Sequence, residues 1–298
     1  MATTNSITTT YVGKDTKEFI SPILNAGVTL GAGGVTIKKN VKYKARVTKV
    51  ALSGLIADAT CDFTPAGTVT QTEVWLTVKQ LEVNMELCKA DYFDDFVAEN
   101  ESPKDMPKAF LKYLLGEIGA HIADDIETKI WQGADGAGSF DGFETLFAAD
   151  SNVAKISTPV AITASNAISE ARRVIAAAVA AKPALLQKSD THLYVGSTVF
   201  QALREAYNDK YSAKPQGEIV YEVDGVKIFY AAGMDAGSMV LAEKANLWFG
   251  TWESSELNRV SVLDMAAIDL SQNIRLAVGF FAGVQYGIAQ EIFYYAGV

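Results

Sequence analysis

Hydrophobic and polar positions alternate most regularly near the C-terminal end of the chain. From Ile274 to Ile288, every second residue is apolar and, except for Ala282, bulky, whereas the intervening positions carry mostly small residues. Successive side chains of a β-strand point to opposite faces, so this period of two predicts one long strand with a bulky face and a small face. A face of small residues lets another element approach closely.

The same period occurs earlier in two further segments. Apolar residues alternate with Lys, Arg and Thr from Val41 to Thr48, which predicts an amphipathic strand with a basic outer face. A second extended segment, 74–87, changes the parity of its apolar residues near Lys79–Gln80, as a bulge or turn would. The segment TCDFTPAGTVTQT (60–72) between them is expected to form a loop or hairpin tip. Residues 28–88 are therefore predicted to be a β-rich excursion.

Apolar residues recur with helical spacing over 106–132, which predicts a helix about 40 Å long at ~1.5 Å per residue. Asp105 is its expected N-cap, Pro107 suits its first turn, and Gly133 ends it. The glycine-rich stretch 133–147 that follows is interpreted as a loop leading into another strand or turn.

The region 159–259 reads as a mixed α/β unit. Asp224-Gly225 is a strong signal for a two-residue hairpin turn. The elements expected in this region are a helix over 164–181, a buried strand over 191–196, a helix over 198–207 that begins with a capping box, and a hairpin over 219–230.

Composition indicates a globular chain that needs no disulfides or bound metal to fold. The 298 residues are 49% hydrophobic and 20% charged, with a net charge of −9. The two cysteines, Cys61 and Cys88, have no metal-ligand spacing and exclude a disulfide-dense scaffold. The N-terminal residues show no secretory signal pattern, and the longest uncharged C-terminal stretch, Leu276–Gln290, is shorter than a membrane span. An acidic chain is also a poor candidate for wrapping DNA or coating an anionic membrane.

One group of residues has the spacing of metal ligands. Glu117, His121 and Asp125 fall at i, i+4 and i+8 of the expected long helix, with Asp124 beside them. A di-metal site in a bundle needs a matching Glu-x-x-His helix, and the helix over 164–181 offers only Glu170. We therefore favour an exposed charged stripe, and keep a metal-dependent enzyme as the competing hypothesis.

Other catalytic patterns are absent from the sequence. The glycines of 133–142 follow a helix and lack a GK[ST] sequence, so the context of a phosphate-binding loop is missing. The sequence holds no GxSxG and no HExxH, and His192 lies at the start of a predicted buried strand, where a core or strand-edge role is expected. We predict a protein that is not an enzyme and that needs no cofactor.

A basic run between positions 38 and 49 contains no acidic residue. With Tyr43 as its only aromatic residue, it has three interpretations: a nucleic-acid contact, a solvated strand face, or a contact between copies of the chain. We favour the contact between copies, because an acidic stretch at 91–105 is complementary in charge. The predicted interface residues are Lys38, Lys39, Lys42, Lys44, Arg46 and Lys49 on one side, and Asp91, Asp94, Asp95, Glu99 and Glu101 on the other.

The expected order of parts is a polar arm, a β-rich excursion, a long helix, an α/β unit and a closing strand. Four stretches add to this pattern: IADDIETKIWQGADGAGSFDGF (122–143), LYVGSTVFQALREAYND (193–209), VYEVDGVKIFYAAGMDAGSMVLAEKANLWFGTWE (220–253) and NIRLAVGFFAGVQYGIAQEIFYYAG (273–297). Together they resemble the major capsid proteins of tailed bacteriophages, which share the Hong Kong phage-type fold. The resemblance covers nearly the whole chain and rests on the size and order of elements.

This resemblance implies an α+β fold with four parts. These are an N-terminal arm (1–27), an extended β loop (28–88) that lies over a neighbouring subunit, a peripheral domain (89–158 and 260–298) that carries a spine helix at 106–132, and an axial domain (159–259) that points toward the capsomer centre.

The resemblance also implies a structural function. Such subunits self-assemble as hexamers and pentamers into an icosahedral shell around double-stranded DNA, which they contact weakly and without sequence specificity. Expected partners are further copies of the chain, a portal and either a separate scaffolding protein or none, with a decoration protein as an optional addition. Assembly is expected in the host cytoplasm. An encapsulin-type nanocompartment shell is the alternative, and a secreted surface-layer protein is disfavoured because no signal sequence is seen.

Overall fold

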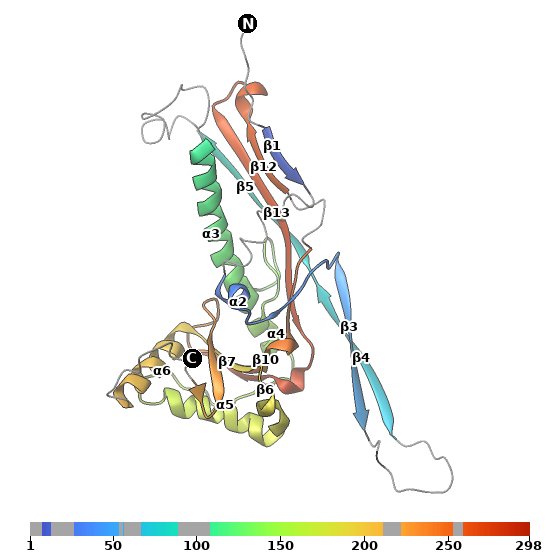
Figure 1. The fold of residues 1–298 in the computed structure, drawn as a ribbon, viewed down its shortest axis with the longest axis vertical. Helices are drawn as coiled ribbons and strands as arrows, with labels where there is room; N and C mark the ends of the chain where they lie inside the picture. The colour runs from blue at the N-terminus through green and yellow to red at the C-terminus, as the bar shows by residue number, and fades with distance from the viewer. Residues whose placement is uncertain are drawn as a thin grey trace.

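The computed structural model describes residues 8–12, 27–53, 56, 67–88, 108–210, 222–252 and 259–298. The molecule is elongated, and one long strand and one long helix run side by side through its upper half (Figure 1). A two-stranded ribbon projects from its middle, and a compact unit of sheet and helices forms the lower end. This architecture is the α+β class that the sequence predicts.

The long C-terminal strand organises the first sheet. It runs from Asn273 to Tyr286 and confirms the prediction from the alternating pattern. The short N-terminal strand is an edge of this sheet, so residues 8–12 of the expected arm are extended and paired. The strand order is β1 (Thr8–Val12), β12 (Arg259–Asp264), β13 (Asn273–Tyr286), β11 (Leu247–Gly250) and β2 (Thr36–Lys38), and β5 (Lys79–Cys88) pairs with β13 off this path.

The long helix α3 spans Lys108–Gln132, within the predicted range of 106–132. Ile118, Ile122, Ile126 and Ile130 are all buried, and they share a core cluster with the apolar face of β13. This is the helical spacing on which the prediction rested. The expected N-cap Asp105 and first-turn Pro107 lie outside the described residues.

The projecting ribbon consists of β3 (Lys44–Ser53) and β4 (Thr68–Thr77), joined in register over ten residue pairs. Val78 separates β4 from β5, next to the predicted change of parity at Lys79–Gln80. Within 28–88, β5 instead runs along β13 as part of the first sheet. Val41 differs from the expectation only because it precedes β3, whereas its burial, at 5% exposure, agrees with its place on the apolar face of the pattern.

Two short helices were not predicted. Residues 143–149, expected to enter a strand or turn, form α4 (Phe143–Ala149), so that expectation is wrong. Phe143 and Phe147 lie four residues apart and are fully buried. A single pair of apolar residues at i and i+4 is too short a pattern to distinguish a helix from a strand in the sequence. The other is α2 (Val28–Gly31), which precedes β2.

The lower unit contains the second sheet, with a strand order that mixes distant parts of the chain. Asp224 and Gly225 have φ angles of 49° and 81°, which is the turn predicted from their sequence. The helices α5 (Ala167–Ala181) and α6 (Ser197–Lys210) confirm the two predicted helices. The strand order is β6 (Ala154–Lys155), β14 (Phe293–Tyr295), β10 (Met239–Glu243), β7 (Thr191–Val195), β9 (Val226–Tyr230) and β8 (Glu222–Val223).

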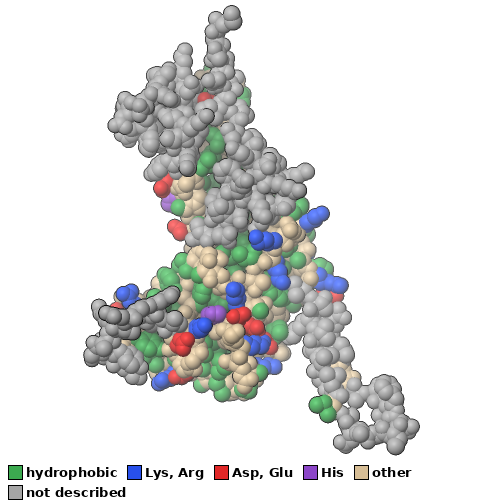
Figure 2. Space-filling model, viewed as in Figure 1, with side chains coloured by type: hydrophobic (Ala, Val, Ile, Leu, Met, Phe, Trp, Pro, Cys, Tyr) green, Lys and Arg blue, Asp and Glu red, His purple; other side chains and the backbone are tan. Residues whose placement is uncertain are grey.

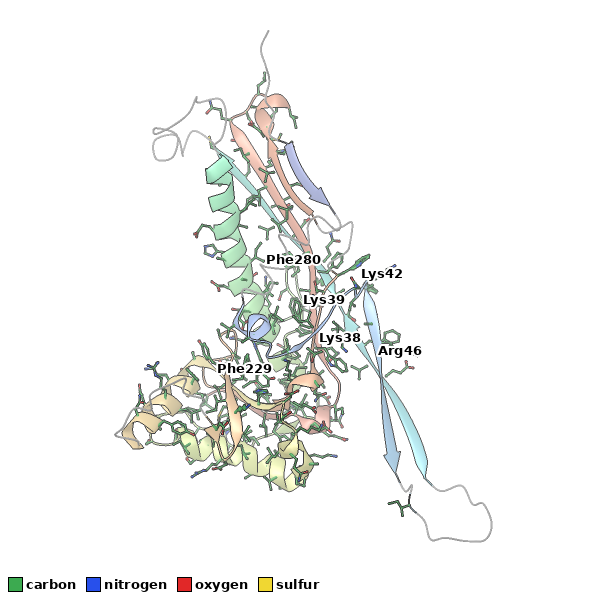
Figure 3. All side chains as sticks on the ribbon, viewed as in Figure 1. Lys38, Lys39, Lys42, Arg46, Phe229 and Phe280 are labelled. Atoms are coloured by element: carbon green, nitrogen blue, oxygen red, sulfur yellow. The ribbon has the colours of Figure 1, made fainter. Side chains whose placement is uncertain are left out.

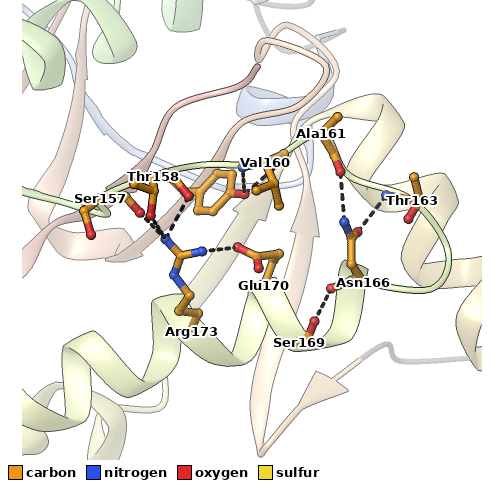
Figure 4. A network of polar contacts seen from close by, with 10 residues as sticks. Ser157, Thr158, Val160, Ala161, Thr163, Asn166, Ser169, Glu170 and Arg173 are labelled. Atoms are coloured by element: carbon orange, nitrogen blue, oxygen red, sulfur yellow. Dashed lines mark hydrogen bonds and ion pairs between the residues drawn. The ribbon is translucent and has the colours of Figure 1, made fainter.

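A polar network ties α5 to the segment that enters it (Figure 4). Arg173 forms an ion pair with Glu170 at 2.7 Å and donates to the carbonyl oxygens of Ser157 and Thr158. The Tyr295 hydroxyl, from β14, accepts the Val160 N–H at 2.7 Å. The network therefore connects α5 and the segment before it to β14. No helix among the described residues has the length and apolar character to span a membrane.

Candidate functional site

The predicted basic residues lie where the ribbon leaves the body of the molecule. Figure 3 places Lys38, Lys39, Lys42 and Arg46 along the path from β2 into β3. Lys44 begins β3, and Lys49 lies farther along the same strand. The predicted acidic partners Asp91, Asp94, Asp95, Glu99 and Glu101 lie outside the described residues, so their contact with the basic residues stays a prediction.

Several of these cations already have partners within the chain. Lys38 Nζ lies 5.7 Å from the centroid of the Trp248 ring. Lys44 Nζ lies 5.4 Å from the Tyr43 ring centroid, in the geometry of a cation–π contact. Arg46 pairs with Glu73 across the ribbon at 2.8 Å. Lys44 and Arg46 are exposed and Lys38 is half-buried, so each contact contributes little stability and the positive charge remains available to another molecule.

Two exposed aromatic residues stand beside the cations. Tyr43 is 67% exposed and Trp75 is 49% exposed, and Trp75 is the direct cross-strand neighbour of Arg46. Sequence reasoning treated Tyr43 as one aromatic residue in a basic run and missed Trp75. The sequence contained a signal for the exposure of Trp75. In the alternating pattern of this strand, Trp75 occupies the face that otherwise carries polar residues.

A groove of about 650 Å³ lies next to these aromatic side chains. Tyr43, Trp75 and Thr77 line it from the ribbon, Phe281 and Val284 from β13, and Asp135 and Asp141 from the glycine-rich loop. Lys79 also lines the groove, and its Nζ donates to Asp135 Oδ1 at 3.0 Å, to Ser139 O at 2.9 Å and to Gly136 O. The groove thus joins an aromatic wall to an acidic one.

The glycine-rich loop is shaped by close packing. A Cβ on Gly133 would lie 2.3 Å from the Phe140 carbonyl oxygen, and one on Gly142 would lie 2.5 Å from that of Trp131. These distances leave room only for glycine at both positions. The loop follows α3 and precedes α4, as the interpretation of a turn requires.

The residues with metal-ligand spacing are spread along an exposed face of α3. Glu117, His121, Asp124 and Asp125 are all exposed, and Asp125 forms an ion pair with Lys129. Among the described residues, no group of three or more His, Cys, Asp or Glu side chains is arranged to hold a metal ion. The geometry is that of the charged stripe favoured from the sequence.

His192 lies in β7 and has the environment of a strand residue. Its Nδ1 is 2.9 Å from the Asp190 carbonyl oxygen, and its ring centroid is 6.1 Å from that of Tyr194. Burial raises the pKa of the Tyr194 phenol well above its usual value, so this neighbour stays neutral.

Among the described residues, Glu144 is the buried carboxyl group whose pKa is raised most. It is 6% exposed, and burial raises its pKa from 4.5 to about 7, with the negative charge of Asp235 adding to the rise. Hydrogen bonds from the Asp235 N–H, at 3.1 Å, and from Ser238 partly oppose this effect. Glu144 Oε1 has no hydrogen-bond partner. Because Glu144 belongs to α4 and Asp235 precedes β10, this group lies where the upper and lower parts of the molecule meet.

No protein-family model and no curated protein matches the sequence. The fold, however, is similar to solved shell structures over nearly all of the chain. A procapsid of satellite phage P4 matches 95% of this chain and 90% of its own, with a TM-score of 0.60 and 12% identity. A structure from Mycobacterium phage Adephagia matches 91% and 90%, with a TM-score of 0.59 and 12% identity.

A virus-like particle from Pyrococcus furiosus also matches, covering 95% of this chain and 99% of its own, with a TM-score of 0.54 and 9% identity. Most of the similar structures are phage capsids. The chain therefore has the fold of phage major capsid proteins.

Proposed function

We propose that this chain is the major capsid protein of a tailed double-stranded DNA bacteriophage, which self-assembles as hexamers and pentamers into an icosahedral shell around the genome. The observation that carries the proposal is the match of the fold to phage capsid structures along nearly the whole chain. The structurally similar proteins are capsid proteins, not enzymes.

The projecting ribbon supports this function on physical grounds. Among the described residues, β3 and β4 pair only with each other. An isolated two-stranded ribbon is marginally stable in water and gains stability from a surface to lie on. A neighbouring subunit would provide that surface, and the cations at the ribbon's origin would help fix its position against acidic residues of that subunit, for which the sequence suggests Asp91 to Glu101.

The division into parts follows from the same proposal. Residues 1–27 would be the arm, 28–88 the extended loop, 89–158 with 260–298 the peripheral domain, and 159–259 the axial domain. The further partners would be a portal, a scaffolding or decoration protein, and packaged DNA held by weak contacts. The shell would assemble in the host cytoplasm and become part of the virion.

The mass and shape of the purified protein test the proposal. A closed icosahedral shell contains at least ~60 copies, so particles of this 32.0 kDa chain would weigh about 1.9 MDa or more. Light scattering and negative-stain electron microscopy should show shells, tubes, or separate pentamers and hexamers. A monomer or dimer at every salt and protein concentration, with candidate scaffolding protein present, would contradict the proposal.

An encapsulin-type nanocompartment shell is the second candidate, favoured by the match to the virus-like particle from Pyrococcus furiosus. Such a shell would enclose a protein cargo. Nuclease-protected DNA inside particles isolated from the source cells supports the phage capsid, whereas an enclosed protein and no DNA supports the nanocompartment.

A further inference from the structure

The loop between β9 and β10 joins the lower unit to α3 and α4. We call residues 231–238 the joint loop. Gln132 Nε2 of α3 donates to the Gly233 carbonyl oxygen at 2.9 Å, and a Cβ on Gly233 would lie 2.0 Å from a carbonyl oxygen of the same helix. The Asp235 N–H donates to Glu144 Oε2 of α4 at 3.1 Å. Glu144 is therefore the side chain that can lose a proton among these contacts.

Glu144 is a buried carboxyl group with an incomplete set of hydrogen bonds. Acidic side chains normally lie at the surface, as Figure 2 shows beside α3 and on the lower unit. Glu144 is instead 6% exposed, and its Oε1 has no hydrogen-bond partner. The buried Glu127 differs, because the Thr29 N–H and hydroxyl each donate to one of its oxygens. A buried polar atom without a partner is rare in native proteins, so its presence at the joint requires an explanation.

The groups that face Glu144 favour its neutral form. Burial and, to a lesser extent, the negative charge of Asp235 raise its pKa to about 7. Tyr294 faces it from β14, and burial together with the charge of Glu144 raises the pKa of this phenol to about 12, so Tyr294 is neutral. The other elements packed on α4 are α3, which contributes no charge to this shift, and β13, whose Tyr286 donates to Asp150 instead. Among the described residues, no cation offsets the two negative charges that ionisation of Glu144 would bring together.

One hydroxyl group serves both carboxyl groups of the joint. Ser238 Oγ lies 3.2 Å from Asp235 Oδ2 and also hydrogen-bonds to Glu144. The same oxygen accepts the Gly297 N–H at 2.8 Å. A serine hydroxyl has a single proton to donate, so two ionised carboxylates would compete for it. A protonated Glu144 removes this competition, because it then carries a donor of its own.

We propose that Glu144 is a proton-controlled latch, whose neutral carboxyl group holds the joint loop on α4 and whose ionisation releases the loop. The released loop loosens the connection between the lower unit and α4. The step moves one proton from the carboxyl group to solvent and changes no other covalent bond. The inference goes beyond the proposed function, because both parts of the latch belong to one copy and the latch acts with or without assembly.

Hydrogen exchange of the joint loop measures the opening. In the open loop Glu144 meets water and has its ordinary pKa of 4.5, whereas the closed loop holds the pKa at about 7. The open fraction therefore rises with pH between these two values and levels off above them. Corrected for the intrinsic effect of pH on exchange, residues 231–238 should lose about tenfold in protection between pH 5.5 and pH 8. Local opening exposes little surface, so this loss should be insensitive to 1 M urea, unlike exchange of residues 174–178 in α5.

Two variants and a control separate the latch from a general effect of pH. Glu144→Gln cannot ionise, so the protection of residues 231–238 should stay within about twofold from pH 5.5 to pH 8. Asp235→Asn removes the neighbouring charge and keeps an acceptor for Ser238, so it should make the loss with pH smaller; it carries the test if circular dichroism shows that Glu144→Gln does not fold. The control Glu170→Gln removes a carboxylate held by Arg173 and should leave the loss unchanged.

Three results would overturn the latch. The first is full protection of the joint loop at pH 8, or an equal loss in Glu144→Gln. The second is a loss that urea accelerates in parallel at the joint loop and α5, which is unfolding of the whole chain. The third is recovery of protection at pH 8 by millimolar calcium only while Glu144 and Asp235 are both present, which would make the pair a cation site. These measurements need no shell, so failure of the proposed function would leave their outcome unchanged.

Discussion

Gly250 of β11 and Gly283 of β13 lie directly opposite each other in the first sheet, and the root of the ribbon, at Thr77 and Val78, lies against this pair. A Cβ on Gly283 would lie 2.2 Å from the Thr77 carbonyl oxygen, and a Cβ on Gly250 would lie 2.8 Å from Val78 Cγ1. The two glycines therefore form a notch in the sheet surface. This notch seats the junction between β4 and β5, from which the ribbon projects.

Gly283→Ala should therefore displace the ribbon. The new methyl group meets backbone at Thr77, which cannot rotate away as a side chain would, so we expect a loss of about 1–3 kcal/mol in the free energy of unfolding. Urea denaturation measures this loss. We also expect the variant to form irregular assemblies in electron micrographs, because the ribbon leaves the body at a changed angle.

Gly116→Ala is the control for this substitution. Gly116 is exposed on α3 and a Cβ there meets nothing within 4 Å. Alanine in a helix is favoured over glycine by about 0.5–1 kcal/mol, so this variant should be slightly more stable than the unmodified protein. Equal stability of the Gly283 variant and the unmodified protein would show that the notch does not constrain the ribbon.

Glu144 should make stability depend on pH around neutrality. Its pKa is raised from 4.5 to about 7, so the folded protein retains a proton on this group that the unfolded chain has lost. Stability is then lost as pH rises through the interval from 4.5 to about 7 and levels off above it. A rise of this size corresponds to about 3 kcal/mol. Thermal unfolding between pH 5 and 8.5 measures the slope.

Glu144→Gln keeps the shape of the protonated carboxyl group and removes its titration. We expect this variant to show a flatter dependence on pH than the unmodified protein and greater stability at pH 8. The control is Glu170→Gln, which changes a carboxylate held by Arg173 instead of one without a cationic partner. Parallel pH profiles for Glu144→Gln and the unmodified protein would refute the role of Glu144.

Lys79 should restrain the glycine-rich loop more than it stabilises the fold. Its Nζ contacts three acceptors between Asp135 and Ser139, but the pair with Asp135 is exposed. Lys79→Met should leave the thermal midpoint nearly unchanged, since exposed ion pairs contribute little. Hydrogen exchange at residues 136–139 should become faster. Lys129→Met, which breaks only the exposed pair with Asp125, should leave that loop unaffected.

The elements that could be predicted from the sequence are those whose pattern is local and long. The period of two in β13 spans 14 residues, and the helical repeat of α3 spans 25, so each pattern recurs often enough to be read without knowledge of its partners. The turn at Asp224-Gly225 was predictable for another local reason. Asp-Gly is a residue pair that tolerates positive φ angles, and both positions adopt them.

What could not be predicted depends on contacts between distant segments. The notch needs Gly250 and Gly283 in one register, and no local pattern pairs residues 33 positions apart. The burial of Glu144 depends on the loop at Asp235, 91 residues away. The exposure of Trp75 likewise depends on the ribbon projecting from the body. The basic run was visible in the sequence, whereas the pairing of Trp75 with Arg46 across the ribbon was not.

The last prediction concerns a buried polar connection between α2 and α3. The Thr29 N–H and hydroxyl both donate to the carboxylate of Glu127, the former at 2.9 Å, and the Thr29 oxygen accepts the Trp131 Nε1–H at 2.8 Å. Thr29→Val preserves the shape and removes the hydroxyl group. It leaves the indole N–H and one carboxylate oxygen unpaired in the core, so we expect a loss of about 3 kcal/mol. Urea denaturation measures the change.

Thr128→Val is the matched control, because Thr128 is on the same helix and its exposed hydroxyl donates only to the Asp124 carbonyl oxygen at 3.1 Å. A surface change of this kind should stay within about 0.5 kcal/mol. If the two threonine variants lost similar stability, the Thr29 hydroxyl would contribute no more than an exposed one. A larger loss for Thr29→Val would instead show that this connection holds α2 against α3, because Thr29 is the α2 residue that reaches both Glu127 and Trp131.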